Sequence, residues 1–195
     1  MSKLVAGSWP VLRQLHLVLC RLTEASLYKL VQGNLPLLEV LALPLTELQC
    51  PAMQTLSQGD WPLLRELDLS GNDLGAPAVT HLNQARWPQI QKLDLAANHI
   101  FEPDGLASLL KGKRMCLQSL SLGYMELGGT QQADMAELFK GDWPLLTNLN
   151  LTYVTLTGRQ LTLQNVWPLL QSLHLSRTGI DASCLTQLVR ASWPM

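Results

Sequence analysis

The chain has 195 residues, of which 47% are hydrophobic and 15% are charged, and its net charge is −1. This composition excludes a disordered chain, and the near-zero charge argues against nucleic acid or an anionic membrane as a partner. No apolar run approaches the ~18 residues of a membrane span, and none of signal-peptide length follows the N-terminus. The four cysteines form no CxxC pair and no regular framework, which predicts reduced thiols and a cytoplasmic location.

A short phrase, usually containing Trp-Pro, opens each copy of an internal repeat. It reads SWPVL at 8–12, NLPLL at 34–38, DWPLL at 60–64, RWPQI at 86–90, DWPLL at 142–146 and VWPLL at 166–170, with a degenerate KRMCL at 113–117. From the last residue of each phrase runs the spacing LxxLxLxxxxL, and all 28 of its slots in the seven copies hold Leu or Ile. Successive copies are 24–29 residues apart. The alternation of apolar and other residues predicts a short strand with one buried face.

The second half of most copies is predicted to be helical. In TEASLYKLVQG (23–33), Thr23 can cap the start of the helix and Gly33 can end it in the left-handed conformation. The same glycine slot, two residues before the Trp position, recurs at Gly7, Gly59, Gly112 and Gly141. Ala85 fits such a slot poorly because alanine avoids that conformation. Each copy is therefore expected to run strand, turn, helix.

A period of this length with these leucines resembles the leucine-rich repeat, and the resemblance covers essentially the whole chain. It implies an α/β solenoid of about seven repeats of ~26 residues, with a curved parallel sheet inside and helices outside. The domain is then a single array, 1–195, open at both ends. The pattern is most similar to the longer helical intracellular types, cysteine-containing and ribonuclease-inhibitor-like, with Trp-Pro where the former has Cys-Pro.

Two repeated side chains have structural interpretations. All six tryptophans occupy the opening phrase, which predicts a stacked ladder along one edge of the solenoid. Asn72 and Asn98 occupy the slot where this family often has an asparagine that bonds the backbone of the next turn.

The sequence offers no catalytic set, no cofactor motif and no metal site. His16 and His174 share a repeat slot, but six strand steps separate them by about 30 Å. Asp68 and Asp94 fall in the same slot of neighbouring copies, about 5–7 Å apart, as an acid–base pair would. An open sheet face encloses no pocket, however, and Lys92 lies near enough to balance their charge. We therefore expect a protein that is not an enzyme.

The outward slots of the strands form a concave face with three zones. The first two copies are mostly apolar, the middle two are acidic with small residues, and the last three are polar with two adjacent tyrosines. Exposed apolar patches and tyrosines are typical of interfaces. The residues expected to bind a partner are Val18, Leu19, Val40, Pro44, Leu45, Glu66, Asp68, Asp94, Tyr124, Tyr153 and Arg177.

The sequence favours a scaffold that binds a protein or peptide on this concave face, as solenoids of this kind do. The apolar zone could instead cover the end of the array or contact an upstream segment, and the tyrosines could simply pair across strands. A second hypothesis is a structural subunit or fragment of a larger assembly, which self-associates or assembles through uncapped ends. A third, by fold analogy alone, is the substrate-recognition module of a ubiquitin ligase.

Overall fold

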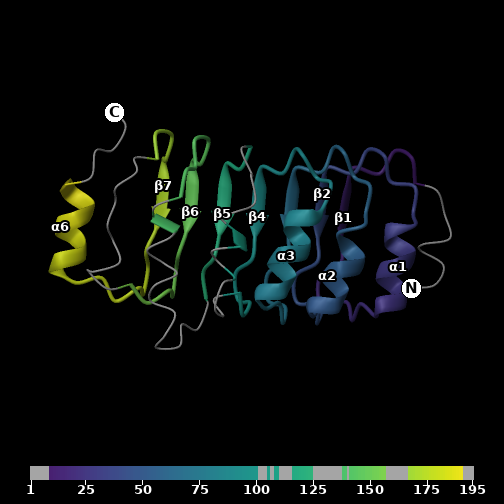
Figure 1. The fold of residues 1–195 in the computed structure, drawn as a ribbon, viewed down its shortest axis with the longest axis horizontal. Helices are drawn as coiled ribbons and strands as arrows, with labels where there is room; N and C mark the ends of the chain where they lie inside the picture. Colours follow the sequence, from purple (N-terminus) through teal and green to yellow (C-terminus); the bar gives the residue numbers. More distant parts are fainter. Residues whose placement is uncertain are drawn as a thin grey trace.

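The computed structural model describes residues 9–100, 105, 108–109, 116–124, 138–139, 141–156 and 167–190. Seven strands pair in parallel, in chain order, as one sheet (Figure 1). They are β1 (Gln14–His16), β2 (Val40–Ala42), β3 (Glu66–Asp68), β4 (Lys92–Asp94), β5 (Ser119–Ser121), β6 (Asn148–Asn150) and β7 (Ser172–His174). The predicted order and repeat of strands are confirmed, whereas both predicted open ends, residues 1–8 and 191–195, lie outside the described residues.

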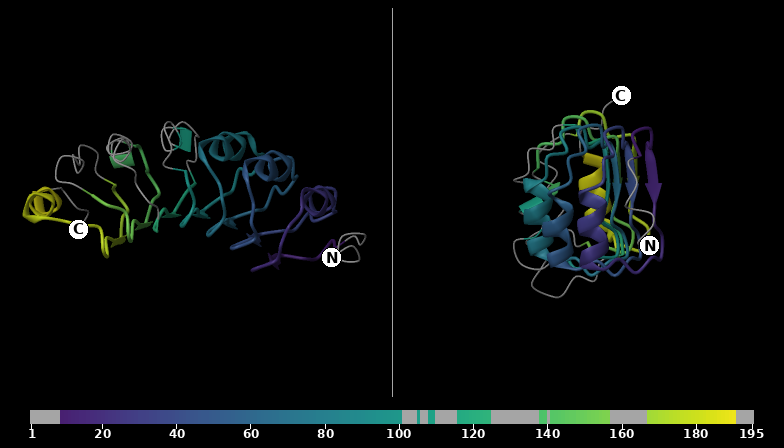
Figure 2. Two further views of the ribbon diagram at one scale, coloured as in Figure 1. Left: turned by 90° about the horizontal axis from the view of Figure 1, so that it is seen from below. Right: turned by 90° about the vertical axis from the view of Figure 1, so that its right-hand side faces the viewer.

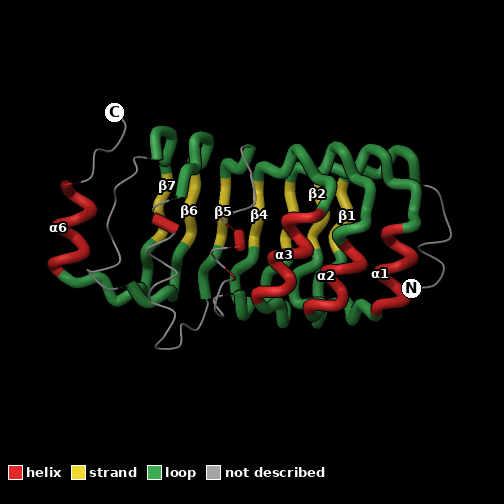
Figure 3. Tube along the Cα trace, in the orientation of Figure 1, coloured by secondary structure: helices red, strands yellow, loops and turns green. Residues whose placement is uncertain are grey.

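The helices lie on one side of the sheet. The described helices are α1 (Glu24–Val31), α2 (Cys50–Leu56), α3 (Ala76–Gln84) and α6 (Ala182–Arg190). The elements follow an arc, with the strands on its inner side and the helices on its outer side (Figure 2). Loops continue from both ends of the strands toward the next element (Figure 3). The protein is therefore an α/β solenoid with an exposed concave sheet face.

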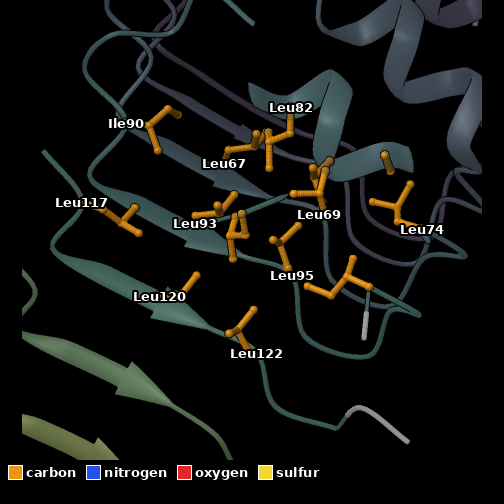
Figure 4. Packing of buried hydrophobic residues seen from close by; sticks show 14 of the residues in the cluster. Leu67, Leu69, Leu74, Leu82, Ile90, Leu93, Leu95, Leu117, Leu120 and Leu122 are labelled. Atoms are coloured by element: carbon orange, nitrogen blue, oxygen red, sulfur yellow. The ribbon is translucent and has the colours of Figure 1, made fainter. Parts of the chain in front are cut away.

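The core is a ladder of leucines between the sheet and the helices. Leu67, Leu93 and Leu120, from neighbouring strands, are each no more than 1% exposed and lie in register (Figure 4). In the first and last copies, Leu15 and Leu173 are only partly buried against this core. Because one copy buries only a few aliphatic side chains and must order about 26 residues, its stability depends on its neighbours.

The two predicted asparagines are buried and bond to backbone, but in the opposite direction from the one expected. Asn72 Nδ2 donates to Leu43 O at 2.9 Å, one copy earlier, and to Leu69 O in its own copy. Asn98 repeats this pattern, since its Nδ2 donates to Leu69 O at 2.9 Å and its Oδ1 accepts from Leu74 N at 3.1 Å. Each asparagine therefore ties its copy to the preceding turn and not to the next.

The expected helix start is confirmed and the expected helix end is wrong. Thr23 Oγ1 accepts a hydrogen bond from Ser26 N at 3.2 Å and caps α1. Neither Gly33 nor Gly59 is in the left-handed conformation; Gly7 and Gly112 lie outside the described residues. A Cβ on Gly59 would lie 2.6 Å from the Trp61 ring. Gly59 is therefore needed for close packing against Trp61 and not for its backbone conformation. The equivalent slot one copy later holds Ala85, whose φ of −64° any residue can adopt.

The tryptophan ladder is partial among the described residues. Trp61 and Trp87 stack with their ring centroids 5.6 Å apart. Trp167 stacks instead on Phe139, at 5.7 Å, and Trp193 lies outside the described residues. The degenerate fifth phrase has Arg114 in the Trp slot, so that copy supplies no ring to a continuous ladder.

Candidate binding site on the concave face

Every strand is followed, three residues after it ends, by a residue in the left-handed conformation. The φ values at this position lie between 53° and 63° in all seven copies. The amide of each of the first six donates to a carbonyl of the next copy, at 2.7–3.1 Å. We call these residues the left-handed row: Leu19, Leu45, Gly71, Ala97, Tyr124, Tyr153 and Arg177. The regular hydrogen bonds impose this conformation whatever the side chain, although only one of the seven residues is the glycine that adopts it without strain.

The left-handed conformation was predicted for the glycine before the Trp slot, and it occurs in this row instead. Gly71 was the one signal for it, because the other six residues of the row are not glycine. Five members were nevertheless expected in the binding surface, for their side chains: Leu19, Leu45, Tyr124, Tyr153 and Arg177.

Polar side chains at the strand ends shape the turns that lead into the row. Asp68 Oδ1 accepts from Ser70 N at 2.9 Å, and Asp94 Oδ1 accepts from Ala96 N at 2.9 Å. Asn150 Oδ1 does the same with Thr152 N at 3.0 Å. Short side chains of this type favour turns by such local bonds. Asp68 and Asp94 thus have a structural role that is independent of any partner.

The acidic zone keeps a net negative charge. Lys92 Nζ lies 2.7 Å from Glu66 Oε1, and both side chains are exposed. Lys92 therefore pairs with Glu66 and not, as expected, with the two aspartates. Within the described ranges, neither Asp68 nor Asp94 has an ion-pair partner. Burial raises the pKa of Asp94 and the charge of Asp68 raises it further, against the lowering effect of hydrogen bonds from Ala96 N and Ser121.

An open hollow of about 290 Å³ lies over the first five strands. Its lining includes His16, Val40, Glu66, Asp68 and Asp94. The hollow opens to solvent along the sheet and does not enclose a substrate. It brings the acidic zone beside the apolar zone, as the sequence predicted for neighbouring copies.

The apolar zone is exposed mainly on the turns after the strands. Leu19 is 72% exposed, and Val18 and Leu45 are each 50% exposed. Val40 and Pro44 are only partly exposed. The first three side chains therefore present most of the apolar surface that a partner could cover.

The aromatic end of the row is a three-membered stack. The rings of Tyr124 and Tyr153 lie 4.7 Å apart at 26°, and the Arg177 guanidinium carbon lies 5.2 Å from the centre of the Tyr153 ring. Tyr124 is 56% exposed and Tyr153 is 42% exposed. The structure brings these three expected residues together, so they form one surface.

The two histidines that share a repeat slot are not neighbours. His16 lies on β1 and His174 on β7, at opposite ends of the sheet. Within the described part of the chain, no three His, Cys, Asp or Glu side chains are grouped so that they could hold a metal ion. In the same part, no helix is both long and apolar enough to cross a bilayer.

Comparison with known proteins finds a family match for one repeat of the chain. The family profile described as "Leucine Rich repeat" matches residues 62–82. One similar structure is a tropomodulin C-terminal domain from Caenorhabditis elegans, 14% identical, with a TM-score of 0.44, covering 77% of this chain and 79% of that one. Another is an internalin from Listeria monocytogenes, 18% identical, with a TM-score of 0.45, covering 83% of this chain and 47% of that one. No curated protein sequence matches the chain.

The seven-fold leucine pattern, the parallel sheet in chain order and the profile match together define the class. The chain has the fold of an α/β leucine-rich repeat solenoid, and its residues 62–82 match the leucine-rich repeat family. Its assignment to the cysteine-containing or ribonuclease-inhibitor-like subtype stays a prediction.

Proposed function

We propose that the protein is a non-enzymatic scaffold that binds a protein or peptide along its concave face and the left-handed row. The observation that supports this proposal is that six of the seven residues in the row are not glycine, although glycine would adopt the conformation without strain. A residue other than glycine in this conformation costs about 1–3 kcal/mol. Leu19, Leu45, Tyr124 and Tyr153 are 42–72% exposed, so burial within the chain offsets only part of that cost. Their size serves contacts made outside the chain.

The chemical character of the surface changes from one end of the row to the other, and a partner must match that order. Leu19 and Leu45 lie at one end of the row, the uncompensated Asp68 and Asp94 lie beside its middle, and the tyrosine stack lies at the other end. Tyr and Arg are enriched where interfaces bind most strongly. The partner therefore presents, in order, an apolar element, a basic element and a group that packs on aromatic rings.

The apolar zone is the first part to test. The double variant Val18→Asp with Leu45→Asp places two charges in it, and aspartate tolerates the left-handed conformation at position 45. The matched control is Val11→Asp, because Val11 is 79% exposed and precedes β1. The measurement is cross-linked capture from an extract of the source cell, with thermal unfolding followed in parallel.

We expect the native chain and Val11→Asp to retain the same protein, and the double variant to lose it while unfolding at an unchanged temperature. Retention of that protein by all three chains would place the contact elsewhere and overturn the role of the apolar zone.

Assembly is a second candidate function, and α6 favours it. On this helix Leu185 is 54% exposed and Val189 is 81% exposed, so it presents an apolar stripe. If copies associate through this stripe, sedimentation velocity will show association of the native chain that Leu185→Glu with Val189→Glu removes. A native chain that stays monomeric at all concentrations contradicts assembly. No described residue favours the ubiquitin-ligase module over these two.

A further inference from the structure

The left-handed row has a gap at Ala97. On one side, Leu45 covers Gly71, because a Cβ on Gly71 would lie 2.5 Å from Leu45 Cδ2. On the other side stands Tyr124, which belongs to the next copy. Ala97 itself is exposed and carries only a methyl group. The gap is therefore bounded by a leucine side chain and a tyrosine ring.

The gap is wide enough for one planar group. Neighbouring parallel strands lie about 4.8 Å apart, and the Tyr124 and Tyr153 rings, one copy apart, are 4.7 Å apart. A planar group above Ala97 would thus lie one ring spacing from Tyr124.

The stack is open on the side that faces this gap. Tyr153 has Tyr124 in the preceding copy and the Arg177 guanidinium in the following copy. Among the side chains that the structure describes, Tyr124 stacks on Tyr153 of the following copy alone, because the preceding copy carries Ala97. This agrees with its greater exposure, 56% against 42% for Tyr153. The position before Tyr124 in the stack is thus vacant among the described residues, and a group of another molecule can occupy it.

The carboxylates of Asp94 and Asp68 beside the gap favour a positively charged planar group. Asp94 belongs to the same turn as Ala97 and is held there by its bond to Ala96 N at 2.9 Å. Asp68 occupies the same register position on the adjacent strand. Neither carboxylate has an ion-pair partner within the described ranges, and the nearby Lys92 is paired with Glu66.

We propose that the gap above Ala97 binds an arginine side chain of the partner, whose guanidinium stacks on Tyr124 and pairs with Asp94. This rests on the proposed scaffold function and names the basic element that its partner presents. A guanidinium is planar, permanently charged and able to stack, whereas a lysine ammonium is compact and an aromatic ring carries no charge. Arg177 on Tyr153 shows that a guanidinium fits a tyrosine of this row.

The chain supplies its own test variants. Ala97→Leu fills the gap, and the backbone accepts leucine at this position because Leu19 and Leu45 have φ 55°. Ala97→Gly keeps the gap open and suits the conformation, so it is the matched control. Tyr124→Leu removes the ring and leaves Ala97 unchanged. The probes are the blocked peptides acetyl-Gly-Ser-Arg-Ser-Gly-amide and its lysine counterpart, titrated by NMR with the amide of residue 97 and the ring of Tyr124 as reporters.

We expect the arginine peptide to shift both reporters in the native chain and in Ala97→Gly. The lysine peptide and the Tyr124→Leu chain should bind about two- to fivefold more weakly, the loss of one exposed cation–π contact. Ala97→Leu should show no saturable shift. Equal binding of the arginine peptide by Ala97→Leu and the native chain, or no shift at these reporters in the native chain, would overturn the proposal.

Capture by the Ala97→Leu chain distinguishes the arginine site from the scaffold function. If Ala97→Leu still captures the protein that the Val18→Asp, Leu45→Asp chain loses, the scaffold function stands and the arginine site fails. If both chains lose it while unfolding at the native temperature, both proposals are supported.

Discussion

The side-chain oxygen of Asn72 accepts hydrogen bonds from the backbone amides of both Thr46 and Leu48, one copy earlier, each at 3.0 Å. Asn72 is only 7% exposed and Thr46 is fully buried, so no solvent replaces these bonds. One side chain thus satisfies the backbone of two turns at once.

Replacing Asn72 with alanine should therefore lower the free energy of unfolding by about 3 kcal/mol, because several buried backbone groups lose their partner together. Chemical denaturation measures this. The control is Asn148→Ala, where the asparagine is exposed on β6, and a change within about 0.5 kcal/mol is expected. Equal stability of the two variants would show that the turns do not depend on Asn72.

Unlike the replacement of Asn72, a substitution in the left-handed row should not destabilise the fold. Leu19→Gly relieves the strain of a leucine at φ 55° and gives up little burial, since Leu19 is 72% exposed. We expect the free energy of unfolding to stay the same or to rise by up to about 1 kcal/mol. Thermal unfolding measures the change, and a clear destabilisation would mean that the leucine packs within the fold and is not reserved for a partner.

Glycine matters for another reason at position 59. Gly59→Ala brings a methyl group against the Trp61 ring, which is only 1% exposed and has no room to move. Overpacking of this kind costs about 1–3 kcal/mol. Ala85→Gly, at the equivalent slot one copy later, removes a methyl group and should cost no more than about 1 kcal/mol. Denaturant unfolding of the pair decides the point, and a neutral Gly59→Ala would contradict the packing role.

The repeat made most of the fold predictable. Leu67, Leu93 and Leu120 share one slot in the sequence and lie side by side on β3, β4 and β5, because parallel strands keep their register when the copies have nearly equal length. For the same reason Tyr124 and Tyr153 were predictable neighbours. The position of a side chain within the repeat therefore predicts which side chains it contacts in the neighbouring copies.

Backbone conformation and hydrogen-bond direction were less predictable. The rule that glycine marks positive φ failed at Gly33 and Gly59, and positive φ occurred at Leu19 and Tyr124. Here the bonds between copies impose the conformation whatever the side chain, so local preference carries no signal. The pairing of Lys92 with Glu66 was missed because a spacing in sequence places charges in a neighbourhood but does not choose between three carboxylates.

Asp94 gives the protein a pH-dependent stability that can be measured directly. Burial, and then the neighbouring Asp68, raise its pKa in the folded state, so the folded chain holds this proton more tightly than the unfolded chain does. Stability from this group is therefore fully present below the unfolded carboxyl pKa and is lost as the pH rises through the higher folded value.

The variant Asp94→Asn has no carboxyl group at this position, so it does not lose this stability as the pH rises. The amide oxygen can still accept from Ala96 N, as Asn150 already does from Thr152 N in the sixth copy at 3.0 Å. We expect Asp94→Asn to be more stable than the native chain at neutral pH, by about 0.5 kcal/mol or less for a site outside the core. The difference should shrink as the pH falls through the carboxyl range. Urea unfolding across that range measures it, and a gap that widens toward low pH would mean that the Asp94 carboxylate stabilises the fold.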